Sequence, residues 1–159
     1  GENTTSGAWD VALTADGSYT GVDGLAVGVG YGEANIDAGN DSNNTDADMT
    51  AFIKYAAGPV SLGIQVSNEE RSTAADQETT AWGVAFNVNE NLSLSYGERD
   101  IDFVDGSAGA TVTEKVDGIA VAYTMGSIKI AGNRNEASNM AGSSNDNDSM
   151  TEIAVSFAF

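Results

Sequence analysis

Apolar and polar residues alternate along nine stretches of the chain, and this alternation is its dominant pattern. Side chains on a β-strand point alternately to opposite faces, so a period of two predicts one apolar and one polar face. In the last stretch, Ile153, Val155 and Phe157 alternate with small or polar residues. We therefore expect nine strands, at residues 8–20, 24–34, 49–57, 60–68, 79–88, 92–101, 115–125, 127–134 and 150–159.

The connections between these stretches alternate in length. Short connections rich in Gly, Asn and Pro, which suit tight hairpins, lie near residues 21–24, 58–59, 89–91 and 126–127. Long polar connections lie near residues 35–48, 68–78, 102–114 and 135–149. Short turns at one end and long loops at the other are typical of an antiparallel up-and-down transmembrane β-barrel.

The aromatic residues follow the same alternation. Trp and Tyr favour membrane interfaces, where the ring contacts lipid and the polar edge contacts water. Ten of the twelve aromatic residues fall at apolar positions of the predicted strands, and seven of these lie toward one strand end or the other. They predict an aromatic girdle at each rim of a barrel; its candidate members are Trp9, Tyr19, Tyr31, Tyr55, Trp82, Tyr96, Tyr123 and Phe157.

Composition narrows the possible functions. The 159 residues carry a net charge of −18 with only six basic side chains, which argues against binding nucleic acid. The chain has no His or Cys, and no phosphate-binding loop is evident, so we expect no enzymatic activity. Its 41% hydrophobic content argues against disorder, and no run approaches the roughly 18 apolar residues of a membrane helix.

The polar positions of the strands supply candidates for the wall of a water-filled channel. Three of the six basic residues fall there, and charged side chains on a channel wall tune ion selectivity. Because acidic residues outnumber basic ones in the whole chain, we expect a weak preference for cations. The candidate lumen-facing residues are Lys54, Arg99, Lys129, Asp10, Asp16, Gln65 and Glu152.

One polar loop, at residues 37–48, is rich in Asp and Asn. Clustered carboxylate and amide oxygens suit Ca²⁺. The loop lacks the glycine at the sixth position and the distal glutamate of an EF-hand, so a solvated external loop is the simpler interpretation. We expect no cofactor, with Ca²⁺ bound in this loop as the alternative.

Two segments connect the pattern to a known family: the terminal strand at residues 152–159, and the hairpin at residues 19–32. With them, the chain resembles the C-terminal half of the general bacterial porins, most closely the alphaproteobacterial type. The resemblance implies a 16-stranded, homotrimeric, water-filled pore for passive diffusion of ions and small hydrophilic solutes across the outer membrane. It also implies that Phe159 is the terminal aromatic that the outer-membrane barrel assembly machinery uses.

Nine strands depart from the even strand number of bacterial single-chain barrels. We therefore expect residues 1–159 to form a single porin β-barrel domain that is incomplete at its N-terminus and supplies strands eight to sixteen. The loop that narrows such pores would then lie in the missing part. Two alternatives remain open: a soluble β-sandwich or solenoid whose core is the apolar face, and a non-channel surface barrel with a structural or adhesive role.

Overall fold

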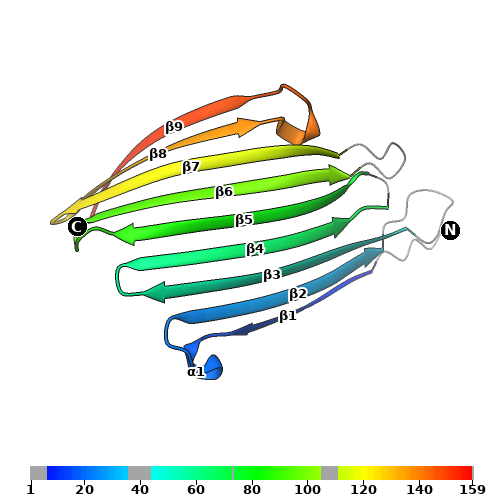
Figure 1. The fold of residues 1–159 in the computed structure, drawn as a ribbon, viewed down its shortest axis with the longest axis horizontal. Coiled ribbons are helices and arrows are strands. Elements are labelled where there is room, and N and C mark those ends of the chain that lie inside the picture. Colours follow the sequence, from blue (N-terminus) through cyan, green and yellow to red (C-terminus); the bar gives the residue numbers. More distant parts are fainter. Residues whose placement is uncertain (1–6, 36–43, 73, 105–110, 159) are drawn as a thin grey trace.

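A single antiparallel sheet of nine strands, in chain order, makes up the fold in the computed structural model, which describes residues 7–35, 44–72, 74–104 and 111–158 (Figure 1). Two short helical turns, α1 (Gly17–Thr20) and η1 (Met140–Gly142), lie in the connections. The strands are β1 (Ala8–Ala15), β2 (Leu25–Asn35), β3 (Thr45–Ala57), β4 (Val60–Glu70), β5 (Asp76–Asn87), β6 (Leu92–Val104), β7 (Thr111–Met125), β8 (Ile128–Ser138) and β9 (Asp148–Phe157).

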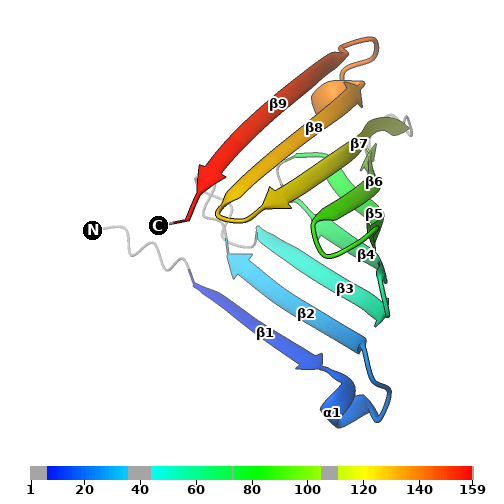
Figure 2. The same ribbon diagram turned by 90° about the vertical axis from the view of Figure 1, so that its left-hand side faces the viewer.

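The antiparallel up-and-down order of the predicted strands is confirmed, because every strand pairs with its neighbour in the sequence. The sheet is open: among the described residues, β1 and β9 each pair on one side only. It is bent rather than flat, and in Figure 2 its two outer strands lie toward the same side, so the sheet forms a trough. No second layer packs against either face in the described part of the chain, so the alternative of a two-layer sandwich is not observed there.

Most strands extend further toward the long connections than the alternation predicts. β3 begins at Thr45, β6 continues to Val104 and β8 to Ser138. In these extensions the apolar face carries mostly polar or small residues, as where Asp102 pairs with Thr113, whereas on the opposite face of β6 and β7 Phe103 pairs with Val112. The backbone ladder continues after the apolar face has lost its large side chains, so an alternation that keeps its apolar residues on one face does not mark these extensions.

The first predicted strand, at residues 8–20, is wrong in its last part. β1 ends at Ala15, and Asp16 caps the short helix α1 by accepting hydrogen bonds from the N–H and hydroxyl of Ser18, at 3.0 and 2.5 Å. These hydrogen bonds lower the pKa of Asp16. Asp and Ser make such local bonds in competition with strand pairing. Asp16 and Tyr19 therefore do not share the strand alternation, and Tyr19 is 85% exposed.

The predicted tight turns at 58–59, 89–91 and 126–127 are confirmed, whereas the one at 21–24 is wrong, because it is the end of a longer connection, residues 16–24, that contains α1. Gly58 and Gly126 have φ of 57° and 60°, a left-handed conformation that glycine adopts without steric cost. In the turn before β6, the side chain of Asn89 accepts hydrogen bonds from the N–H groups of Asn91 and Leu92. These turns join β3 to β4, β7 to β8, and β5 to β6 at one end of the sheet (Figure 1).

Continuous registers give the sheet two different faces. Val27, Ile53, Ile64 and Trp82 are consecutive partners across four strands and belong to the apolar face. The opposite face, here called the small-residue face, carries Gly, Ala, Ser and scattered polar residues. No hydrophobic side chain among the described residues is buried, and Leu13 and Ile153 on the apolar face are 70% and 75% exposed.

The small-residue face is the crowded side of the bent sheet. A Cβ added to Gly28 would lie 2.3 Å from the Phe52 ring, and one added to Gly118 would lie 2.1 Å from Asn135 Oδ1. On the apolar face, a Cβ added to Gly132 would have no neighbour closer than 3.6 Å. Bending crowds the side chains on the hollow side and spreads those on the outer side, so we assign the small-residue face to the inside of the trough in Figure 2.

The strands are staggered as well as bent. A row of cross-strand partners that starts at Leu25, the first residue of β2, passes through Tyr55 and Tyr96. It reaches Thr151, well inside β9, rather than the end of that strand. A consistent stagger of this kind accompanies the strand tilt of β-barrels.

Candidate functional site

The apolar face carries an uncharged band toward the short turns. The band runs from Val60 to Val66 on β4 and from Met125 to Ile119 on β7, which is about 20 Å along a strand. Within it, the described strands place no charged side chain on this face. Toward the long connections the same face becomes acidic, with Glu78, Glu98 and Asp117 beyond the edge of the band.

Aromatic side chains lie along both edges of this band. At the edge nearer the long connections, Trp9 contacts Tyr31 with ring centroids 5.6 Å apart, and Trp82 contacts Tyr96 at 5.5 Å; both pairs are tilted. At the short-turn edge lie the apolar-face residues Tyr55, Tyr123 and Phe157. Of the other predicted aromatic positions, Tyr19 lies on α1, and Phe159 is outside the described residues.

The small-residue face holds six of the seven candidate lumen residues. The registers place them opposite small or polar partners: Lys54 opposite Gly63, Arg99 opposite Ala81, and Lys129 opposite Ser156. Asp16 is the exception, because it lies after the end of β1. The remaining members of the set on this face are Asp10, Gln65 and Glu152.

Lys54 lies in a shallow hollow of this face. The hollow has a volume of about 540 Å³, and Lys54 is its single charged lining residue; the small-residue positions around it are Ala26, Ser61, Gly63, Gly83, Ala85, Ser95 and Gly97. The Lys54 ammonium nitrogen is 5.8 Å from the centroid of the Phe52 ring. Among the described residues, neither Lys54 nor Lys129 has a carboxylate within 4.0 Å. Their charges are therefore available to ions in water.

Arg99 has a partner that the sequence did not reveal. Its Nη2 is 3.0 Å from Oε1 of Glu114, which lies on the same face of the neighbouring strand. The predicted loop at 102–114 placed Glu114 outside any strand. The sequence does not show that β7 starts before Glu114 and pairs with β6 there. This pairing makes Arg99 and Glu114 diagonal neighbours on one face.

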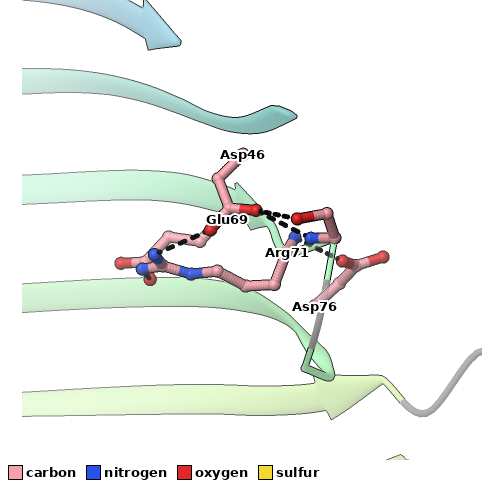
Figure 3. A network of polar contacts seen from close by, with 5 residues as sticks. Asp46, Glu69, Arg71 and Asp76 are labelled. Atoms are coloured by element: carbon pink, nitrogen blue, oxygen red, sulfur yellow. Dashed lines mark hydrogen bonds and ion pairs between the residues drawn. The ribbon is translucent and has the colours of Figure 1, made fainter. Parts of the chain in front are cut away.

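A second polar cluster binds the connection between β4 and β5 to the end of β3 (Figure 3). Asp46, whose side chain is 7% exposed, accepts hydrogen bonds from the hydroxyl and N–H of Ser72 at 2.6 and 2.8 Å. Arg71 lies 3.7 Å from the other oxygen of Asp46 and also pairs with Glu69. The Arg71 N–H donates to Asp76 at 2.8 Å.

The electrostatics of this cluster follow from these contacts. The bonds from Ser72, and then the charge of Arg71, hold the pKa of Asp46 below its usual range. The hydrogen bond to Glu69 and the surrounding carboxylates raise the pKa of Arg71 further above its ordinary value. Both groups stay charged at neutral pH, and the pairs hold the connection against the rim of β3.

The predicted calcium loop is only partly visible. Its residues 37–43 lie outside the described residues, while Asp46 and Asp48 belong to β3 and lie on the small-residue face. Within the described ranges, no group of three or more carboxylates is arranged to hold a metal ion. No helix in the described part of the chain has the length and apolar character needed to cross a membrane.

Comparison of the chain with models of known protein families, with curated proteins and with solved structures finds no match.

Proposed function

We propose that this chain forms part of the wall of a porin-like channel in a bacterial outer membrane, through which ions and small hydrophilic solutes diffuse passively. The observation that carries the proposal is the uncharged apolar band, exposed on the outer face and bordered by aromatic residues at both edges. Transmembrane barrels present such a band, about 25 Å tall, to lipid.

The free energy of burial argues that this face is covered. More than twenty large apolar side chains are between about two-fifths and four-fifths exposed. At about 1 kcal/mol for each half-exposed side chain, their transfer from water is worth tens of kcal/mol. That exceeds the roughly 5–15 kcal/mol by which a folded domain is stable. Lipid is the covering we propose, because a second protein layer would not call for aromatic residues along both edges.

Strand direction sets a condition on closure. β1 and β9 run in the same direction, because eight antiparallel pairings separate them. An up-and-down barrel pairs its first and last strands antiparallel, so closing this sheet takes an odd number of further strands. Seven more would give the 16-stranded barrel that leaves an aqueous channel. Two copies related by rotation about the barrel axis would meet with parallel edges, so they do not satisfy the condition.

Charge on the inner face supports a preference for cations. The strand residues of the small-residue face include more carboxylates than basic groups, which favours cations in a water-filled lumen. The basic residues are Lys54, Arg99 and Lys129; the acidic ones are Asp10, Asp46, Asp48, Glu69, Glu114, Asp148 and Glu152.

Electrical recording from the intact polypeptide, inserted into a planar lipid bilayer, tests the proposal. We expect steady conductance steps in multiples of three, as for a homotrimer, and a reversal potential that favours cations under a salt gradient. Lys54→Gln removes a positive charge that has no carboxylate partner among the described residues, and it should increase the preference for cations. Lys115→Gln is the matched control, because Lys115 lies on the other face and is paired with Asp100 at 2.9 Å.

Three outcomes would each contradict a part of the proposal. A silent bilayer, with the protein demonstrably inserted, would favour a barrel with a structural or adhesive role. A reversal potential that favours anions would contradict the proposed selectivity, and equal effects of the two lysine variants would contradict the placement of Lys54 in the lumen.

A further inference from the structure

The connection between β8 and β9, residues 139–147, folds back over the small-residue face. Within it, the N–H of Ala141 donates a hydrogen bond to Oε2 of Glu114 at 2.8 Å. Gly142 packs so closely on Phe103 that an added Cβ would lie 3.0 Å from the ring. Glu114 and Phe103 belong to the small-residue face of β7 and β6, near the loop ends of these strands, so the connection bends inward over this face at the rim of the proposed lumen. Figure 1 shows its helical turn η1 beside the loop ends of β7 and β8.

This connection adopts an unfavourable backbone conformation. Asn139, Ala141 and Asn145 have φ of 54°, 52° and 69°, in the left-handed region. Asparagine tolerates this region, but alanine rarely adopts it. Such conformations persist where surrounding contacts hold them. Here Asn139 donates to the Thr113 carbonyl at 3.0 Å, and its own side-chain oxygen accepts from the N–H of Asn145 at 3.1 Å.

Glu114 links this connection to Arg99, one of the basic residues of the proposed channel wall. One carboxylate oxygen holds Ala141, and the other pairs with Arg99 at 3.0 Å. The Glu114 side chain is only 13% exposed, so its two carboxylate oxygens have little contact with water. Removing the charge of Glu114 would weaken both attachments at once, since a carboxylate accepts stronger hydrogen bonds than an amide.

We propose that residues 139–147 are a constricting loop of the channel and that Glu114 is the latch that holds it over the lumen. This inference rests on the proposed channel function. The wild-type conductance is then limited partly by this loop, and it rises when the loop is released. Arg99 has the second role of orienting the Glu114 carboxylate toward the Ala141 N–H.

A disulfide reports the position of the loop without reference to conduction. The chain has no cysteine, so the double variant Phe103→Cys with Gly142→Cys carries the only two thiols. A Cβ built on Gly142 lies 3.3 Å from the Phe103 Cβ, close to the spacing of about 3.5–4.5 Å in disulfides. The ring that would crowd a side chain at position 142 is absent from this variant, although a cysteine there still has to adopt the left-handed φ of 73° that Gly142 has. We expect the pair to oxidise readily in the membrane-inserted protein; two thiols that remain open to maleimide would overturn the inference.

The conductance of Glu114 variants then tests whether this carboxylate holds the loop in place. We expect Glu114→Gln to give larger and noisier conductance steps than wild type, by roughly a quarter or more. Oxidation of the cysteine pair in the same background should return the conductance toward the wild-type value, and reduction should raise it again. Glu136→Gln is the matched control, because Glu136 pairs with Arg134 at 2.8 Å on the opposite face. Its conductance should match wild type.

The outcomes separate the two proposals. If the wild-type protein is inserted but silent, the channel function fails and the constriction with it, whereas disulfide formation still reports whether the loop lies over Phe103. If wild type conducts but neither Glu114→Gln nor the oxidation state changes the conductance, the channel remains and the constricting loop is refuted.

Discussion

Single carboxylates, rather than a hydrophobic core, hold the rim of this molecule together. Asp46 fixes the connection after β4 through Ser72 and Arg71, and Glu114 fixes the connection after β8 through Ala141. Both side chains lie on the small-residue face, beyond the uncharged band. In each case one buried or nearly buried carboxylate accepts hydrogen bonds from groups of the connection.

The stability contributed by Asp46 depends on pH in a definite direction. Its folded-state pKa is lower than in the unfolded chain, where a carboxyl has a pKa of about 3.9. The contribution is therefore fully present above about pH 4 and is lost as the pH falls through the lower, folded-state value. We expect Asp46→Asn to unfold at lower urea concentration at neutral pH and to lose less further stability on acidification than wild type.

Urea unfolding of the vesicle-inserted protein over a pH series measures this difference. Asp48→Asn is the control, since Asp48 is the next residue on the same face of β3 and makes no hydrogen bond among the described residues. Parallel pH profiles for wild type and Asp46→Asn would show that this carboxylate does not account for the acid dependence.

At the scale of the element, each strand combines an apolar outer half-surface with a small or polar inner one. The sequence predicts the central part of every strand because large and small residues alternate there, as in Leu62, Gly63 and Ile64. It does not predict the extensions at the rim, where the outer face becomes mostly polar and the apolar residues Phe103 and Val112 lie on the inner face. It also misplaces residues 16–20, because hydrogen bonds that Ser18 donates to the Asp16 side chain start a helical turn.

The candidate site was predictable to a similar extent. Strand alternation was enough to assign Lys54, Arg99 and Lys129 to one face, since that requires only the position of each residue within its strand. The partner of Arg99 required the register between β6 and β7, which the alternation within one strand does not contain. The fold of residues 139–147 depends on Glu114 and Phe103, which are distant in sequence, so no local pattern indicated it.

The same substitution at two neighbouring residues of one strand should have a large effect on stability at one position and almost none at the other. Ile64 lies in the middle of the uncharged band, and Gln65 lies on the small-residue face. Ile64→Arg places a charge in lipid and should lower the free energy of unfolding by about 2–4 kcal/mol. Gln65→Arg places it in water and should change that free energy by less than about 0.5 kcal/mol. Chemical unfolding in lipid vesicles compares them, and equal losses would mean that the two faces do not differ in their surroundings.

At the scale of the whole molecule, the sheet has no interior of its own. The described residues include no buried hydrophobic side chain, and both outer strands have an unpaired edge. An open sheet with such edges and an exposed apolar face is a template for aggregation in water. The bend and stagger of the strands, together with the common direction of β1 and β9, fit a segment of a larger closed barrel in which lipid covers the outer face.

The measurement that tests this account most directly is the accessibility of single cysteines along β4 in the membrane-inserted protein. The chain has no natural cysteine, so Ser61, Leu62, Ile64 and Gln65 can each be replaced in turn. We predict that labels at positions 62 and 64 are quenched by a lipid-bound quencher, and that thiols at 61 and 65 react with a water-soluble reagent. Equal access of the water-soluble reagent to all four positions would contradict the account, because the apolar face would then not lie in lipid.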